Sequence, residues 1–244
     1  MNILCVIPAR YASTRLPGKP LADIAGKPMI QHVYERANQA QRPAKVLVAT
    51  DHEQVYQAVT DFGGQALMTS PDHPTGTDRL AEVARACPEY ELIINVQGDE
   101  PLIEPAVIDQ LAAAFDDEPE LVMATLAAVM AEDEYDKPSA VKVVTKRNGH
   151  ALYFSRSLIP YPRVPAAELP VYKHIGIYAY RRDFLLAYAA LAPTPLERTE
   201  SLEQLRALEH GYNIKVLLTD FQSVGVDTPE DLERVKHILQ EVRR

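Results

Sequence analysis

Short apolar runs alternate with amphipathic helical segments through the first half of the sequence. Residues 92–96, Leu-Ile-Ile-Asn-Val, are almost continuously apolar, which is typical of a parallel strand covered on both faces. Strands that alternate with helices along a chain pair in parallel through crossover connections. We therefore expect an α/β fold with a mostly parallel central sheet flanked by helices. The pattern predicts strands at residues 2–7, 45–49, 65–68, 92–96 and 121–127, and helices at 29–41, 53–62, 78–86 and 106–115.

The pattern changes at about residue 132. Short strands are predicted at 141–145, 151–155 and 172–180, around a proline-rich stretch at 160–170. Antiparallel pairing suits such short strands, so residues 132–182 are predicted to form an inserted β-rich subregion. The α/β pattern then returns, with a helix at 201–209, a strand at 214–218 and a helix from Pro229 with Thr228 as its N-cap. The sequence indicates one domain over residues 1–244.

The charge and the apolar runs exclude several classes of protein. The formal net charge of −9 and the lack of any Lys/Arg-rich run argue against nucleic acid or an anionic membrane as a partner. No apolar run approaches the roughly 20 residues that span a bilayer, and the start of the chain lacks signal-peptide features. Cys5 and Cys87 show no spacing typical of a zinc site or a disulfide framework. A cytoplasmic protein is the expectation.

The loop after the first strand is unusually basic for an acidic chain. In open α/β sheets, ligands bind beyond the carboxyl ends of the strands, and this loop carries Arg10, Arg15 and Lys19 but no acid. Arginine forks and a lysine point charge suit a polyphosphate. The loop is not a Walker A motif, because proline follows Gly18-Lys19, and no GxGxxG motif is present. A solvated basic loop without a ligand is the alternative.

Two acidic residues lie where a strand ends and a loop begins. Asp99 follows the predicted strand at 92–96, and Asp227 precedes the last helix. Mg²⁺ prefers oxygen ligands and is usually held by one or two carboxylates together with substrate phosphates. The pair is therefore a candidate magnesium site. The alternatives are that Asp99 caps a turn and that Asp227 caps the helix; the side chain of Glu100 should point away from that of Asp99 along an extended backbone.

Blocks along the whole chain resemble one bacterial family. They read IPARYASTRLPGKPL at 7–21, GKPMIQHVYERA at 26–37, VATD at 48–51, GTDRLAEV at 76–83, NVQGDEPLI at 95–103, ALYFSRSLIPYPR at 151–163, KHIGIYAYRR at 173–182, ESLEQLR at 200–206 and GVDTPEDL at 225–232. With these blocks the chain resembles the 3-deoxy-manno-octulosonate (KDO) cytidylyltransferases, also called CMP-KDO synthetases. The resemblance implies a nucleotide-diphospho-sugar-transferase-like fold, a homodimer built through the inserted β region, CTP, and Mg²⁺ as cofactor.

The resemblance also implies a reaction and a set of site residues. The reaction is transfer of CMP from CTP to the anomeric hydroxyl of KDO, with release of pyrophosphate, to activate the sugar for lipopolysaccharide or capsule. Asp99 and Asp227 would hold the metal, while Arg15 and Lys19 would bind phosphates and assist catalysis. The implied nucleotide-binding residues are Pro8, Ala9, Arg10, Arg15, Lys19, Thr75, Gly76, Thr77, Gln97 and Gly98, and the implied sugar-binding residues are Arg156, His174, Tyr178, Glu203 and Gln204.

Several alternatives remain open at this level. Thr75, where the family usually has serine, and Thr77 also suit plain helix capping. Taken without the resemblance, His174 and Tyr178 are typical of a core, and Glu203 and Gln204 of a solvated helix face. A relative acting on 8-amino-KDO or a sialic acid would use the same triphosphate loop. A glycosyltransferase would typically carry a D-x-D motif, which is absent here, and a silent nucleotide-binding module would not need both aspartates.

Overall fold

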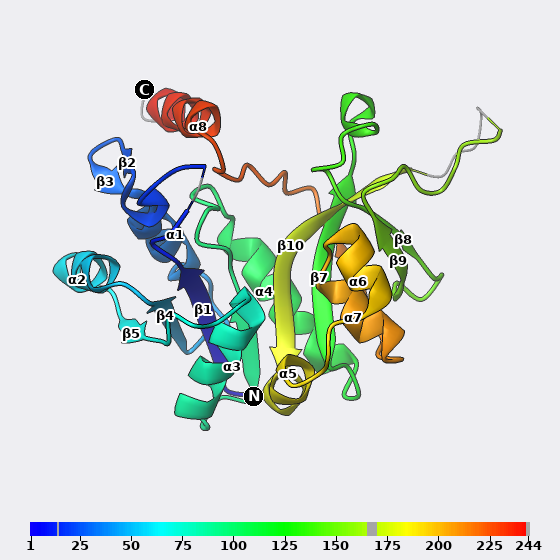
Figure 1. The fold of residues 1–244 in the computed structure, drawn as a ribbon, viewed down its shortest axis with the longest axis horizontal. Coiled ribbons are helices and arrows are strands. Elements are labelled where there is room, and N and C mark those ends of the chain that lie inside the picture. Colours follow the sequence, from blue (N-terminus) through cyan, green and yellow to red (C-terminus); the bar gives the residue numbers. More distant parts are fainter. Residues whose placement is uncertain (14, 165–169, 243–244) are drawn as a thin grey trace.

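The computed structural model describes residues 1–13, 15–164 and 170–242 (Figure 1). Within these residues nine strands join one sheet, and its main path runs β11-β7-β10-β6-β1-β4-β5. The strands of this path are β1 (Ile3–Ala9), β4 (Lys45–Thr50), β5 (Ala66–Met68), β6 (Leu92–Asn95), β7 (Met123–Val129), β10 (Tyr172–Arg181) and β11 (Lys215–Leu218). The other two are β8 (Lys142–Thr145) and β9 (Ala151–Ser155), while β2 (Asp23–Ile24) and β3 (Lys27–Pro28) form a separate small ribbon.

The pairing confirms the predicted α/β class. Strand β1 lies between β4 and β6 and is parallel to both, β4 is parallel to β5, and β11 is parallel to β7. Strand β10 is the exception, because it runs antiparallel between β6 and β7. The sheet is therefore mostly parallel, and the carboxyl ends of β1, β4, β6 and β7 lie along one edge.

Helices cover both faces of the sheet and create two separate cores. Successive residues of β1 face opposite sides, so Cys5 packs with one core and Leu4 with the other. The first core takes apolar residues from α1 (Met29–Ala37), α2 (Glu53–Asp61) and α4 (Pro105–Asp117). The second takes them from α3 (Gly76–Ala86), α5 (Arg182–Ala189) and α7 (Gln204–Glu209).

The predicted β-rich region contains antiparallel strands, and its last strand is shared with the main sheet. Strands β8 and β9 form an antiparallel pair, and β8 also pairs with the start of β10 at Tyr172 and Lys173. The register of β10 against β7 shifts between Ile175 and Tyr178. After β9, the exposed residues 160–164 form an arm that leaves the body of the molecule at the upper right of Figure 1. Strand β10 therefore connects the small antiparallel group to the central sheet.

One predicted helix begins later than the sequence pattern suggested. The helix expected at 201–209 is α7, which begins at Gln204 and follows a separate short helix, α6 (Pro195–Glu200). Ser201 ends α6 in a left-handed conformation with φ of 51°, which interrupts the helical hydrogen bonding. Helices α5 and α6 were not predicted.

A long connection brings the end of the chain back across the sheet. Residues 219–228, which we call the strap, run from β11 to α8 (Pro229–Val242) at the opposite side of the molecule (Figure 1). Thr228 caps α8 as predicted, since its hydroxyl accepts from the Asp231 amide at 3.2 Å and the Asp231 carboxylate accepts from the Thr228 amide. Buried Val226 and Val235 pack with Ile24 and Met29, which fixes α8 beside β2.

The described residues form eight α-helices. None of them, from α1 to α8, combines the length and the apolar character needed to cross a membrane. The short 3₁₀ helices η1 (Lys19–Leu21) and η2 (Glu132–Glu134) complete the inventory of regular elements.

Candidate active site

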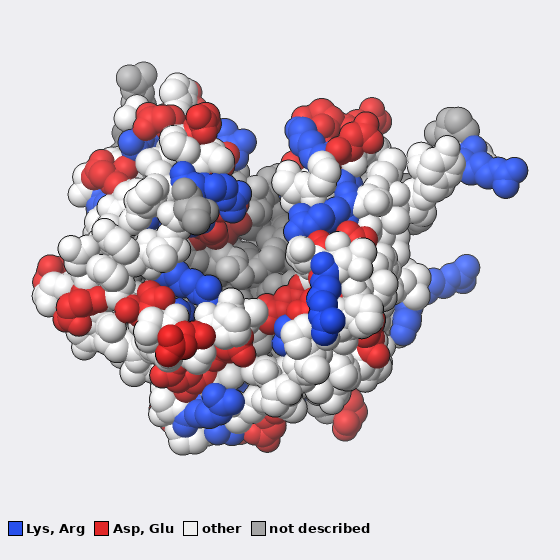
Figure 2. Space-filling view, viewed as in Figure 1, with Lys and Arg blue, Asp and Glu red and all other residues white. Residues whose placement is uncertain are grey.

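A cavity of about 430 Å³ opens where the loop after β1, the loop after β6 and the strap meet. Figure 2 shows the molecule hollowed between its two halves, with basic and acidic side chains gathered along the walls. The cavity lies at the carboxyl ends of the parallel strands, where this class of sheet binds ligands. Its lining residues are Pro8, Ala9, Arg10, Ala12, Ser13, Arg15, Lys19, Pro20, Gly76, Gln97, Gly98, Asp99 and Asp227.

Lys19 lies between the two predicted metal ligands. Its Nζ is 2.6 Å from Asp99 Oδ2 and 2.9 Å from Asp227 Oδ1. Arg15 adds a second cation, with Nη2 3.1 Å from the same oxygen of Asp227. Gly18 makes this placement possible, since its left-handed φ of 66° turns the chain into η1 and presents Lys19 to the cavity. Two acids and two bases from three distant segments thus converge on one point.

The electrostatics of this cluster keep Lys19 charged. Burial alone would lower the pKa of Lys19, but the adjacent carboxylates of Asp99 and Asp227 raise it above its ordinary value. The ammonium group therefore already occupies the centre of a cation site made of two carboxylates. Among the described residues no group of three or more His, Cys, Asp or Glu side chains forms a metal cluster. Two carboxylates without nitrogen or sulfur ligands fit Mg²⁺ bound together with substrate phosphates.

The backbone around Asp99 is tightly packed. A Cβ on Gly98 would lie 2.7 Å from the Pro8 carbonyl oxygen, so only glycine allows the loops after β1 and β6 to approach this closely. Glu100 does not line the cavity, and its carboxylate accepts from the Ser223 hydroxyl. The sequence analysis expected the two side chains to diverge, but it expected an extended backbone, whereas the Glu100 amide donates to the Gln97 carbonyl oxygen at 3.2 Å in a turn. Burial raises the pKa of Glu100 to about 7, with a further contribution from the Asp99 charge, although the Ser223 hydrogen bond opposes the shift.

Arginine side chains brace the loops on the other side of the cavity. Arg10 Nη2 donates to the His73 carbonyl oxygen at 2.8 Å, which ties the first loop to the segment before α3. Arg79 is fully buried; it donates to Asp51 Oδ2 at 2.9 Å and also to Thr69. The loops that follow β1, β4 and β5 are therefore held against α3. Arg79 was missed by the sequence analysis, although a charged residue on the apolar face of a helix was a usable signal.

A second, smaller cavity of about 160 Å³ adjoins the first and shares Gly76 and Gln97 with it. Two polar atoms that line it, Asn95 Oδ1 and Gln204 Nε2, are buried without a hydrogen-bond partner within the described structure. Buried polar atoms normally have partners, so this cavity suits a ligand with several hydroxyl groups or ordered water. Its lining residues are Gly76, Thr77, Asn95, Gln97, Tyr178, Tyr180, Tyr188, Glu203 and Gln204.

The acid of the second cavity is held by a helix start and a tyrosine. Thr75 caps α3 in a capping box with Asp78, and its hydroxyl also lies 3.3 Å from Glu203 Oε1. Tyr188 donates to the Glu203 carbonyl oxygen at 2.7 Å. Burial raises the pKa of Glu203, although hydrogen bonds from Thr77 and Thr75 oppose the shift. The loop at 75–77 therefore caps a helix and also lines both cavities through Gly76.

The structure brings together three of the five predicted sugar-binding residues. Tyr178, Glu203 and Gln204 line the second cavity, whereas His174 and Arg156 line neither of the two. His174 packs edge-on to Phe154 and beside Tyr178, with Nε2 3.0 Å from Thr125 Oγ1, and burial lowers its pKa to about 3. Arg156 donates to the carbonyl oxygens of Glu200, Pro138 and Ser201, and faces a different cavity of about 380 Å³.

Three residues of the second cavity were not predicted. Asn95 is a single polar residue in an otherwise apolar strand, and that exception was a signal that could have been used. Tyr180 and Tyr188 stack on each other with ring centroids 6.2 Å apart. Tyrosines of this kind are common in cores, so nothing in their spacing separates them from structural residues.

Comparisons with known proteins identify the family of the chain. The profile of the family described as "Cytidylyltransferase" matches residues 4–216. The 3-deoxy-manno-octulosonate cytidylyltransferase of Geobacter sulfurreducens is 54% identical over 98% of this chain and 100% of its own. That of Syntrophotalea carbinolica is 55% identical over 98% of this chain and 99% of its own.

Solved structures extend the comparison. A structure of CMP:2-keto-3-deoxy-manno-octonic acid synthetase complexed with CTP matches with a TM-score of 0.95 and 51% identity, covering 99% of this chain and 100% of that one. A cytidylyltransferase from Leptospira borgpetersenii, at 16% identity and a TM-score of 0.66, shares the fold; the match covers 99% of this chain and 87% of that one. The chain belongs to the cytidylyltransferase family, and within it to the 3-deoxy-manno-octulosonate cytidylyltransferases.

Proposed function

We propose that this chain is a nucleotidyltransferase that transfers CMP from CTP to the anomeric hydroxyl of KDO, releasing pyrophosphate. The observation that carries the proposal is the convergence of Lys19, Asp99 and Asp227 in one cavity that adjoins a second, polar one. The relatives that bear this activity in their names match almost the full chain at above 50% identity. The first cavity is chemically suited to a triphosphate and a metal ion, and the second is suited to an acceptor with several hydroxyl groups.

The first cavity is suited to the nucleotide. Arg15 and Lys19 present cations to phosphate oxygens, and arginine does so as a planar fork. Pro8, Ala9 and Gly98 line the same cavity and are the proposed contacts of the nucleoside. Arg10, Gln97 and the loop at 75–77 complete the proposed nucleotide-binding set. Gln97 is held in place by its donation to the Gly176 carbonyl oxygen at 2.9 Å.

The two carboxylates are the proposed ligands of Mg²⁺. Asp99 and Asp227 already face one cation, the ammonium of Lys19, so their oxygens converge as a dication would require. When bound there, Mg²⁺ supplies neutralisation of the charge on the phosphate oxygens. The two residues would hold the ion from different segments: Asp99 lies in the turn after β6, and Asp227 lies on the strap.

The second cavity is suited to the sugar acid. Tyr178, Glu203 and Gln204 supply hydroxyl, carboxylate and amide groups, and Asn95 adds an unpartnered acceptor. His174 and Arg156 remain candidates for sugar binding on the resemblance alone, since neither lines this cavity. The two cavities share Gly76 and Gln97, so an acceptor in the second cavity would lie next to a nucleotide in the first.

The chemical step needs no covalent intermediate with the protein. The anomeric hydroxyl oxygen attacks the α-phosphorus of CTP in line and loses its proton to solvent or a base. The bond from that phosphorus to the bridging oxygen of pyrophosphate breaks, and pyrophosphate leaves with the electron pair. Lys19 and Arg15 stabilise the charge that builds on the leaving group, so positioning and electrostatics supply the rate enhancement.

The test is product analysis by phosphorus NMR. Purified protein incubated with CTP, Mg²⁺ and KDO should give one pyrophosphate per CTP consumed and a CMP-sugar phosphodiester signal. Parallel incubations with 8-amino-KDO and with a nine-carbon sialic acid measure acceptor preference. The proposal fails if CTP is bound but no phosphodiester forms with any of the three acids.

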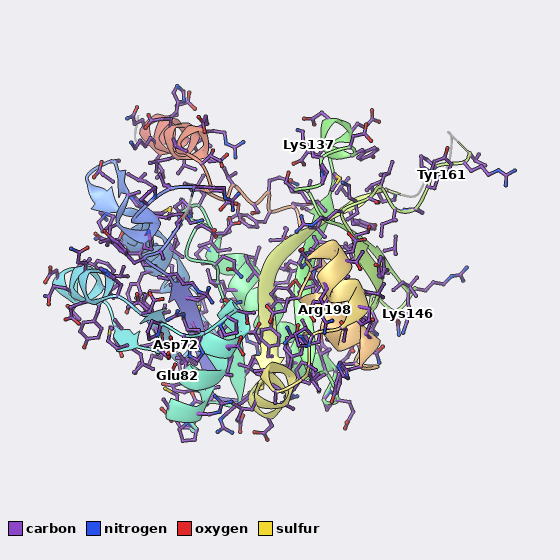
Figure 3. The ribbon with its side chains drawn as sticks, in the orientation of Figure 1. Asp72, Glu82, Lys137, Lys146, Tyr161 and Arg198 are labelled. Atoms are coloured by element: carbon purple, nitrogen blue, oxygen red, sulfur yellow. The ribbon has the colours of Figure 1, made fainter. Side chains whose placement is uncertain are left out.

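We propose also that the protein is a cytoplasmic homodimer joined through its β-rich region. The support is apolar exposure: Tyr161 and Val164 on the arm are 82% and 64% exposed, and Leu152 on β9 is 55% exposed. Figure 3 shows Tyr161 far out on the arm, away from the body of the molecule. Sedimentation of Tyr161→Asp with Val164→Asp should give a monomer, while Leu196→Asp on α6 should leave a dimer. A monomeric wild type would contradict the proposal.

A further inference from the structure

The two proposed metal ligands lie on different kinds of segment. Asp99 lies in the turn that follows buried β6, whereas Asp227 lies on the strap, whose residues 219–228 form no helix or strand. Carboxylates that share one ion must hold their relative positions closely, because Mg²⁺ accepts little departure from octahedral geometry. The strap therefore needs a fixed anchor close to Asp227.

Glu100 provides such an anchor. Glu100 is only 8% exposed, and its carboxylate accepts a hydrogen bond from the Ser223 hydroxyl. Gly225 lies against it, since a Cβ at that position would be 3.4 Å from Glu100 Oε1. The next residue of the strap, Val226, donates its amide to the Asp99 carbonyl oxygen at 2.9 Å. Residues 223–226 thus rest on two adjacent residues, 99 and 100.

The orientation of the two acids separates their roles. Asp99 lines the cavity and contacts Lys19, whereas Glu100 is turned to the opposite side and is not among the residues that line either cavity. Glu100 holds the strap from beneath, and Asp227 follows that held segment directly. The other carboxylate oxygen of Glu100, Oε2, is buried without a hydrogen-bond partner in the described structure. Removing this oxygen from water costs free energy, so burial of the Glu100 carboxylate is unfavourable by itself.

We propose that Glu100 is a positioning residue that clamps the strap through Ser223, so that Asp227 faces Asp99 at the metal site. The proposal rests on the proposed function and adds to it a residue that acts through Asp227. Groups that support metal ligands from behind typically change metal affinity by about 10- to 100-fold when they are removed. Loss of the clamp should therefore weaken metal binding more than it slows the chemistry.

The test uses two clamp variants, one conservative variant and one control on the same strap. Ser223→Ala and Glu100→Ala remove the contact, and Glu100→Gln keeps an acceptor oxygen for the Ser223 hydroxyl. Gln222→Ala changes an exposed strap residue and serves as the control. Each full-length variant is assayed for kcat and for the apparent KM for Mg²⁺. Mn²⁺ affinity without sugar is measured by electron paramagnetic resonance, and amide exchange is measured over residues 223–227.

The expected result is a split between metal affinity and turnover. Ser223→Ala and Glu100→Ala should raise the KM for Mg²⁺ and weaken Mn²⁺ binding about tenfold, with kcat approaching the wild-type value at saturating metal. Amide exchange in the strap should accelerate, Glu100→Gln should recover much of the affinity, and Gln222→Ala should match wild type.

Two outcomes would overturn the proposal. If Ser223→Ala leaves the Mn²⁺ affinity and the amide exchange of the strap unchanged, the contact between Glu100 and Ser223 does not position Asp227. This result can be read even if Glu100→Ala fails to fold. A kcat that stayed low at saturating metal would place Glu100 in catalysis instead. Because metal binding and amide exchange are measured without the sugar acid, both results can be read even if the proposed reaction itself is not observed.

Discussion

The ammonium group of Lys19 lies 2.6 Å from Asp99 Oδ2, between the two proposed ligands of Mg²⁺. The same nitrogen contacts Asp227 at 2.9 Å. An internal cation in this position competes with a dication for the same oxygens. Binding of a triphosphate offers Lys19 other anions, so nucleotide and metal binding should favour each other.

Replacing Lys19 should therefore have opposite effects on the two ligands. In Lys19→Met the acids lose their internal partner, and nucleotide-free protein should bind Mn²⁺ about tenfold more tightly, a change of about 1.4 kcal/mol. CTP should bind more weakly, because a phosphate contact is lost. Paramagnetic resonance of free Mn²⁺ and calorimetry with CTP measure the two affinities. Lys19→Arg keeps the charge and serves as the control; equal Mn²⁺ affinity in wild type and Lys19→Met would refute the competition.

Removing one charge from the metal pair should abolish most of the turnover. For Asp99→Asn or Asp227→Asn we expect kcat to fall by about 10²- to 10³-fold, the scale seen when one preorganised electrostatic group is lost. Pyrophosphate release measures kcat, and thermal unfolding checks that the fold is retained. Asp220→Asn alters an exposed aspartate of the same strap and should behave as wild type. Turnover close to wild type in Asp227→Asn would exclude that residue as a metal ligand.

The close approach of two loops predicts an intolerance to a single methyl group. Gly98→Ala would place a Cβ 2.7 Å from the Pro8 carbonyl oxygen. The two loops must move apart to remove this overlap, which should lower the free energy of unfolding by about 1–3 kcal/mol. The same movement should weaken CTP binding, since both loops line the first cavity. Urea unfolding and calorimetry measure the two effects. Gly176→Ala is the control, because a Cβ there meets nothing within 4 Å; equal losses in both variants would contradict the steric explanation.

The buried histidine of β10 predicts a dependence of stability on pH. Burial lowers the pKa of His174 from about 6.5 to about 3, so between these values the unfolded chain binds a proton that the folded chain does not. The free energy of unfolding should therefore fall as the pH drops from 7.5 to 4.5. His174→Gln cannot titrate, so it should lose less stability over this range than wild type.

Urea unfolding at the two pH values measures this difference. His210→Gln, which alters an exposed histidine just after α7, should retain the wild-type pH dependence. If His174→Gln shows the same fall as wild type, the proton taken up on unfolding belongs to other groups.

The alternation of apolar runs was sufficient to predict the class of fold and most elements of the parallel sheet. Antiparallel pairing was expected for the strand at 172–180, but the pattern could not show that this strand, β10, enters the central sheet between β6 and β7, because a strand's neighbours are fixed by contacts distant in sequence. The helix expected at 201–209 begins at Gln204, because the conformation of Ser201 ends the preceding helix. Helical periodicity carries no information about such a local break.

The site was predictable where chemistry leaves few alternatives. The basic first loop and the acids Asp99 and Asp227 could be singled out by residue type and by their positions after strands. The polar lining of the second cavity could not, since Tyr180 and Tyr188 have the composition of an ordinary core. The contact between Glu100 and Ser223 could not be predicted from the sequence either, because these side chains meet only after the strap has crossed the sheet.

The hydrogen bond between Lys19 and Asp227 joins residues 208 positions apart in the chain. Closing so large a loop carries an entropic penalty, and contacts of this kind slow folding. During refolding, circular dichroism should consequently recover ahead of enzymatic competence. A chain cut before the strap contains every strand from β1 to β11 but lacks Asp227, one of the two carboxylates that contact Lys19.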